Sequence, residues 1–289
     1  MIQQIPRRRE ALPDPAPGPV RAEPRLVARG LRVGYGGAAV LDGVDFAAAP
    51  GEMTVLVGPN GCGKSTLLRT LARALRPQAG EVLLDGRAVH AMPTREVARR
   101  LALLPQGPVA PEGLTVRELV AQGRFPHQSL LRQWSREDAD AVERAMAAAD
   151  VAGFADRPLD ALSGGQRQRC WIAMVLAQGT DHLLLDEPTT FLDLKVQMDL
   201  MALLARVARE EGRTVVLVLH EINVAASFAD HVVMMRQGRV AAAGTPHEAV
   251  TPDLLREVFG LEADVVAAPR TGRPVCIPRA GGSNVVRLG

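Results

Sequence analysis

Nine consecutive residues constrain the fold of this chain more than any other stretch. They read G-x-x-x-x-G-K-S-T and comprise Gly58, Pro59, Asn60, Gly61, Cys62, Gly63, Lys64, Ser65 and Thr66. The apolar residues 53–57 before them favour a buried strand, and residues 67–75 after them have helical spacing up to Pro77. Strand, glycine loop and helix N-terminus together predict a phosphate-binding loop, because free N–H groups and the helix dipole favour an anion there. We expect Lys64 to reach the β- and γ-phosphates and Ser65 to supply a hydroxyl to Mg²⁺.

The lysine of this loop is unusual for the chain. Lys64 and Lys195 are its two lysines, and arginine supplies nearly all the other positive charge. An ammonium is a compact point charge, whereas a guanidinium is a planar fork. The retained lysine therefore argues against a chance match in a glycine-rich sequence.

Composition limits the classes of protein that remain. The 289 residues, 47% of them hydrophobic, suffice for one large α/β domain, and a net charge of +2 gives no sign of a nucleic-acid partner. Cys62, Cys170 and Cys276 are widely spaced, which fits a reducing compartment and argues against a disulfide framework or a structural zinc site. We see no signal peptide and no apolar run long enough to cross a membrane.

The chain divides into three parts on its sequence pattern. Residues 1–24 are Pro-rich and are expected to be a disordered extension, residues 25–262 to be an α/β domain, and residues 263–289 to be a short C-terminal tail. Within the domain, residues 107–165 interrupt the α/β alternation as a helical insert. Thr115 begins a capping box there, and Ser135 is expected to cap a second helix.

Two carboxylates end an apolar run at residues 182–187. Such a pair is often only a solvated strand edge. With the phosphate-binding loop upstream, we expect Asp186 to be the Mg²⁺ partner of Ser65 and Glu187 to orient an attacking water.

Three further motifs narrow the class. Leu162-Ser163-Gly164-Gly165-Gln166, the run Leu-Leu-Leu-Asp-Glu-Pro at residues 183–188, and His220 follow the loop in order. With them, residues 26–262 resemble the ATP-binding subunit of ABC transporters. The resemblance implies a P-loop NTPase of α/β class with a RecA-like parallel sheet core, an N-terminal antiparallel β subdomain and an α-helical insert.

The same resemblance assigns roles at the site. Tyr35 is similar to the aromatic residue that stacks on adenine, and Gln106 to the glutamine that senses Mg²⁺ and the membrane partner. Asp193, in Phe191-Leu192-Asp193, resembles the D-loop aspartate, and His220 the switch histidine near the γ-phosphate. Ser163, Gly164, Gly165 and Gln166 are expected to bind the ATP of a second copy, since a helix N-terminus is a second anion site.

Residues 123–128, 162–178 and 186–194, with His220-Glu221-Ile222-Asn223, look like the ATPases of iron(III)-siderophore importers, nearest to the ferric-enterobactin type. The alternative is an importer of heme or cobalamin. An ABC ATPase of DNA repair or of ribosomes, or a non-hydrolysing regulator, fits less well because the chain lacks a long coiled-coil insertion and retains Glu187. The resemblance implies ATP and Mg²⁺ as cofactors and a head-to-tail dimer. It also implies two membrane permeases, an extracytoplasmic binding protein acting indirectly, and a peripheral place on the cytoplasmic face of the inner membrane.

Overall fold

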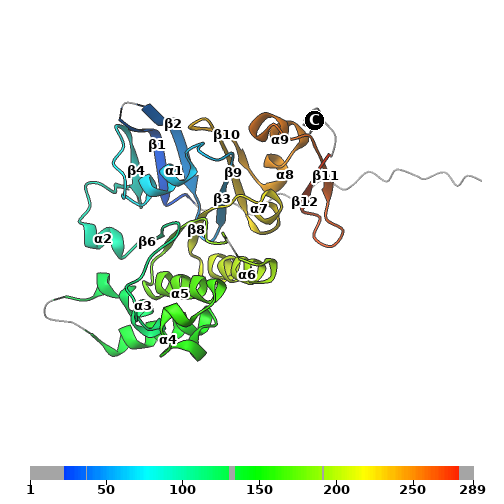
Figure 1. The fold of residues 1–289 in the computed structure, drawn as a ribbon. Helices are drawn as coiled ribbons and strands as arrows, with labels where there is room; N and C mark the ends of the chain where they lie inside the picture. Colours follow the sequence, from blue (N-terminus) through cyan, green and yellow to red (C-terminus); the bar gives the residue numbers. More distant parts are fainter. Residues whose placement is uncertain (1–22, 37, 130–133, 191, 280–289) are drawn as a thin grey trace, which may run out of the picture.

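The structure, a computed structural model, describes residues 23–36, 38–129, 134–190 and 192–279 (Figure 1). The extension predicted at residues 1–24 lies almost wholly outside these ranges. The described residues form a central sheet, a smaller antiparallel sheet and a helical part, shown at the lower left in green. The predicted α/β class, with its parallel core, antiparallel β subdomain and helical insert, is confirmed.

The central sheet positions the site. Within the described residues its strand order is β10-β9-β3-β8-β7-β6, and all neighbours are parallel except the pair β10–β9. Their bounds are β3 Met53–Val57, β6 Leu101–Leu104, β7 His182–Asp186, β8 Thr214–Val218, β9 His231–Arg236 and β10 Arg239–Gly244. The carboxyl ends of parallel strands share one edge, so the segments that follow β3, β6, β7 and β8 converge there.

Both faces of this sheet are covered, as its Val- and Leu-rich strands require. Along β3, Val55 and Val57 join a core shared with the helical part, while Leu56 between them joins a core under the antiparallel sheet. That second sheet has the order β2-β1-β4-β5, with β1 Leu26–Tyr35, β2 Ala38–Ala48, β4 Ala79–Leu84 and β5 Arg87–Ala88.

Helix α1 (Lys64–Leu71) ends earlier than Pro77 would require. Its chain turns at Arg73, which has φ of 62°. The Arg73 and Ala74 amides donate to the Thr70 and Arg69 carbonyls at 3.0 and 2.8 Å, which is a Schellman ending. The expectation of a helix extending to residue 75 is therefore wrong, because an arginine takes the left-handed position that glycine usually fills.

The helical insert is built on N-caps. Thr115, Ser135 and Ser163 each close a capping box, as the sequence predicted for Thr115. Helix α2 Thr94–Ala98 precedes the insert. The insert contains α3 Val116–Gln122, η1 Phe125–His127, α4 Arg136–Ala148, η2 Ala152–Phe154 and η3 Leu159–Ala161, and α5 Gly164–Ala177 begins at its end. Across the described ranges, no helix has the length and apolar character that crossing a membrane needs.

The C-terminal region contains more structure than a tail. After α6 Leu194–Glu211, α7 Ile222–Phe228, α8 Pro246–Ala249 and α9 Pro252–Phe259, residues 263–278 form an antiparallel hairpin of β11 Ala263–Ala267 and β12 Pro274–Pro278. Ala263 and Cys276 are buried in the main core. The Pro- and Gly-rich composition did not predict this hairpin, which lies beside α7 (Figure 1).

A buried histidine should make the fold acid-sensitive. His182 in β7 has no exposed surface, and neither ring nitrogen has a hydrogen-bond partner. Burial lowers the pKa of His182 to about 4. The unfolded chain binds this proton near pH 6.5, so stability is present above that pH and is lost as pH falls toward 4.

The His182→Leu variant should not lose this stability in acid. The difference in free energy of unfolding between the variant and wild type should therefore shift by about 2 kcal/mol in favour of the variant when the pH is lowered from 8 to 5. Urea unfolding at both values measures the difference. His247→Leu is the control, since its Nε2 is hydrogen-bonded to the Gly272 carbonyl in an exposed position. If the free energies of unfolding of His182→Leu and wild type differ by the same amount at pH 8 and pH 5, the lowered pKa of His182 is contradicted.

Candidate active site

The phosphate-binding loop joins β3 to α1 at the sheet edge, and two of its glycines are required by geometry. Gly58 has φ of 153°, and a Cβ there would lie 2.2 Å from the Met235 carbonyl oxygen. Gly63, the N-cap of α1, has φ of 107°, and its Cβ would lie 2.7 Å from Leu41 Cδ2. Any side chain at either position would displace the loop from its neighbours.

Lys64 is buried inside this loop. It is 5% exposed, and its Nζ donates to the carbonyl oxygens of Gly58 at 2.8 Å and Pro59 at 3.0 Å. Both acceptors are neutral, so neither cancels the charge of the ammonium. The lysine is thus held in place with a positive charge directed at the loop interior.

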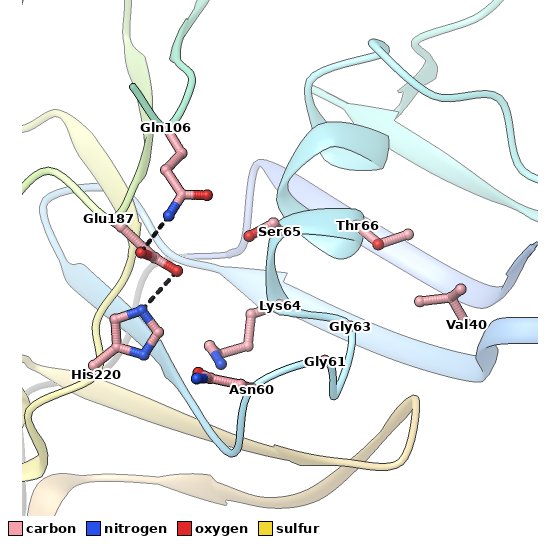
Figure 2. A pocket seen from close by; sticks show the side chains of 10 residues that line it. All are labelled: Val40, Asn60, Gly61, Gly63, Lys64, Ser65, Thr66, Gln106, Glu187 and His220. Atoms are coloured by element: carbon pink, nitrogen blue, oxygen red, sulfur yellow. Dashed lines mark hydrogen bonds and ion pairs between the residues drawn. The ribbon is translucent and has the colours of Figure 1, made fainter. Parts of the chain in front are cut away.

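A cavity of about 450 Å³ opens above the loop (Figure 2). It brings together predicted residues that lie far apart in the sequence. Gln106 follows β6, Glu187 follows β7 and His220 follows β8, and all three face the loop. The lining comprises Val40, Asn60, Gly61, Gly63, Lys64, Ser65, Thr66, Gln106, Glu187 and His220.

Asp186 lines a neighbouring cavity that shares Gln106 and Glu187 with this one. The Ser65 hydroxyl donates to its Oδ1 at 2.7 Å, as expected for two groups that would share a cation. Its Oδ2 is buried without a hydrogen bond, and Arg69 Nη2 lies 3.5 Å away. Burial raises the pKa of Asp186, while the Ser65 hydrogen bond and the Arg69 charge act in the opposite direction. A carboxylate oxygen that accepts no hydrogen bond, beside a hydroxyl, is a fitting ligand pair for Mg²⁺.

Glu187 is the most constrained residue of the site. Gln106 Nε2 donates to its Oε2 at 2.6 Å, and His220 Nε2 lies 2.7 Å from its Oε1 (Figure 2). Its backbone has φ of 52°, in the left-handed region. A non-glycine residue there costs about 1–3 kcal/mol, and such strain concentrates at functional sites. The carboxylate is thus fixed in direction, and its side chain is only 10% exposed.

Other predicted residues do not line this cavity. Ser163 caps α5, accepting from the Gln166 amide at 3.3 Å, and Asp193 caps α6, accepting from the Val196 amide at 3.0 Å. Ser163, Gly164 and Asp193 are exposed. Gly164 lines a neighbouring cavity with Asp186 and Glu187, whereas Ser163, Gly165, Gln166 and Asp193 do not line the cavity over the loop.

Tyr35 ends β1, but its side chain and Phe191 lie outside the described part of the structure. Sequence reasoning missed Val40, which lines the cavity from β2, and Arg69. Arg69 could have been found, because it follows Ser65 by four residues and thus shares its helix face. Val40 carries no comparable signal.

The fold and the cavity define a P-loop nucleotide-binding protein. The profile of the ABC transporter family matches residues 41–190. A probable siderophore transport system ATP-binding protein of Bacillus subtilis is 52% identical over 257 residues, covering 89% of this chain and 94% of that protein. The ferric enterobactin transport ATP-binding protein of Escherichia coli is 47% identical (88% and 94%), and the hemin import ATP-binding protein of Streptomyces coelicolor 45% (95% and 97%).

Solved structures agree in fold. A metal-chelate type ABC transporter in an inward-facing conformation superposes with a TM-score of 0.78 at 26% identity, covering 90% of this chain and 98% of that one. A dimeric bacterial ABC transporter cassette has a TM-score of 0.68 at 28% identity, covering 76% and 98%. The chain belongs to the ABC transporter family as one of its ATP-binding proteins, and it is an ATPase of that class.

Proposed function

We propose that this chain hydrolyses ATP to power import of an iron(III)-siderophore complex. One observation carries the catalytic part: Glu187 is held between Gln106 and His220, in a strained backbone conformation, on the wall of the phosphate-binding cavity. Similarity supports the substrate, because the Bacillus subtilis and Escherichia coli relatives are named for siderophore and ferric enterobactin transport.

Ser65 and Asp186 would hold Mg²⁺, with Gln106 at its edge. The fit rests on the buried Asp186 Oδ2 without a hydrogen bond and on the Ser65 hydroxyl 2.7 Å from Oδ1. When bound, Mg²⁺ supplies positive charge that offsets charge on the phosphate oxygens.

The residues of this chain then divide the work of hydrolysis. Lys64 and the loop amides from Asn60 to Thr66 bind the phosphates, and Tyr35 stacks on the base. Glu187 orients a water for in-line attack on the γ-phosphorus, while Gln106 and His220 keep the carboxylate in place. The bond from the γ-phosphorus to the bridging oxygen breaks, leaving ADP and phosphate.

Two copies pair head to tail in this proposal. Ser163, Gly164, Gly165, Gln166 and Asp193 are exposed or half-buried and do not line the phosphate-binding cavity of their own chain, so a second copy can bring its ATP against them. Closing and opening of the pair would move two membrane permeases docked on the helical insert. The proposed site of action is the cytoplasmic face of the inner membrane, where the subunit is peripheral and a binding protein outside delivers the chelate.

Deletion of the gene tests the substrate. We expect loss of uptake of at least one radiolabelled ferric siderophore and unchanged uptake of heme and cobalamin. Expression of the wild-type chain should restore uptake, and the Glu187→Gln chain should not. Loss of heme or cobalamin uptake with intact ferric siderophore uptake would assign the chain to the alternative importer class, which the hemin import relative represents.

A further inference from the structure

His220 lies between the end of strand β8 and the short helix α7. The Leu219 amide is fixed to the sheet by the Leu56 carbonyl at 3.1 Å, and α7 begins at Ile222. His220 therefore bridges the sheet and α7. This helix has seven residues, and its N-cap residue Glu221 makes no side-chain capping bond. A helix this short has little intrinsic stability, so its direction must be set by its neighbours.

The C-terminal hairpin supplies one of these restraints through Asn223 on α7. The Asn223 Nδ2 donates to the Cys276 carbonyl at 3.0 Å, and its Oδ1 accepts from the Cys276 amide at 2.7 Å. One side chain thus satisfies both backbone groups of a residue on β12. The amide of Asn223 acts as an added strand partner at the open edge of the hairpin.

Arg273, in the hairpin just before β12, holds the other end of α7. Its Nη1 donates to the carbonyl oxygens of Ala226 at 3.0 Å and Ala229 at 2.6 Å, where the helix leaves carbonyls unpaired. A guanidinium there also favours the negative end of the helix dipole. Burial lowers the pKa of Arg273, so the side chain has given up part of its hydration to reach this place.

The hairpin itself is anchored and can act as a support. Cys276 and Ala263 are buried in the main core, and His247 on α8 is hydrogen-bonded to the Gly272 carbonyl at 3.0 Å. Figure 1 shows β11 and β12 beside α7, on the side of that helix away from the antiparallel sheet. Both ends of α7 are therefore tied to one element that lies outside the nucleotide cavity.

We propose that the β11–β12 hairpin positions His220 for hydrolysis, by fixing α7 through Asn223 and Arg273. The inference rests on the proposed role of His220 in ATP hydrolysis. Asn223 and Arg273 are positioning residues, because they reach the reacting groups only through α7 and His220.

Kinetics of the transporter assembled with its membrane subunits test the proposal. Asn223→Ala and Arg273→Met should each lower kcat by about ten- to a hundredfold, since a misplacement of about 1 Å costs this much, and should leave KM for ATP within about twofold. Arg279→Gln is the matched control. It removes an arginine that pairs with Asp264 on the outer face of the same hairpin without touching α7, and kcat should stay at the wild-type value.

A double-mutant cycle separates positioning from general damage. If Asn223 acts through His220, then Asn223→Ala should cause no further loss of kcat in a His220→Ala chain. The same fold loss in both backgrounds, a wild-type kcat, or an effect confined to KM would each overturn the proposal. If thermal melting shows that Asn223→Ala does not fold, Asn223→Asp and Arg273→Met take its place. Their kcat is then compared in the wild-type and His220→Ala backgrounds. Asn223→Asp keeps the acceptor for the Cys276 amide but places a carboxylate oxygen against the Cys276 carbonyl, so kcat is expected to fall with this variant as well.

The two proposals fail separately. Full turnover by Glu187→Gln would refute the proposed hydrolytic site, whatever the hairpin variants do. An inactive Glu187→Gln chain together with an additive cycle would leave the hydrolytic site standing and refute the hairpin's role alone.

Discussion

Glu187→Gln should lower ATP hydrolysis by at least about a hundredfold and leave ATP affinity within about twofold of wild type. Glutamine keeps the size of the side chain but loses its negative charge and basicity. In the wild-type chain one carboxylate oxygen faces Gln106 and the other faces His220. An amide has a single acceptor oxygen, so only one of these two neighbours can still donate a hydrogen bond to it.

Turnover of the assembled transporter and titration with a fluorescent ATP analogue measure the two quantities. Glu210→Gln is the matched control, because it makes the same change at an exposed carboxylate on α6, away from the cavity. Wild-type turnover by Glu187→Gln would rule out Glu187 as the carboxylate that orients water.

Ser163→Arg should abolish the ATP-dependent dimer and lower hydrolysis by about a hundredfold or more. The exposed N-terminus of α5 is proposed to receive the γ-phosphate bound by the other copy, and a long side chain would occupy that place. The dimer is best observed in the Glu187→Gln background, where ATP is not consumed. Light scattering with and without ATP and Mg²⁺ should show a dimer only with nucleotide, and Ser163→Arg should return it to monomer.

Loss of the N-cap could itself weaken α5 by about 1 kcal/mol, so a control must remove a comparable cap. Thr115→Arg removes the capping box of α3, elsewhere in the helical insert. That variant should still dimerise with ATP. A dimer that persists with Ser163→Arg would show that this helix N-terminus does not face the partner's nucleotide.

Local features of the sequence predicted local features of the structure. The loop at Gly58–Thr66 and the capping box at Thr115 depend on residues within a few positions of one another. The meeting of Gln106, Glu187 and His220 depends on the strand order β8-β7-β6, which no short stretch encodes. Glu187 was predicted from the phosphate-binding loop upstream of it, whereas Gln106 and His220 were suggested only through family resemblance.

Two other features of the structure could not be predicted from the sequence. The left-handed backbone of Glu187 is imposed by the turn after β7 and by its side-chain partners, because glutamate has no preference for that conformation. The Pro- and Gly-rich sequence of the β11–β12 hairpin shows no strand pattern of its own. The hairpin is held instead by Asn223, about 50 residues earlier in the chain. Both depend on tertiary contacts.

The strained backbone at Glu187 lowers the stability of the folded chain at a position that activity requires. Glycine would adopt its φ of 52° without the steric cost that a Cβ brings. Selection for thermal stability alone would therefore favour glycine at this position, while selection for turnover retains the carboxylate. In a laboratory population selected for protein stability and not for transport, substitution of Glu187 should appear early. The substituted chain should unfold at a higher temperature and should not hydrolyse ATP.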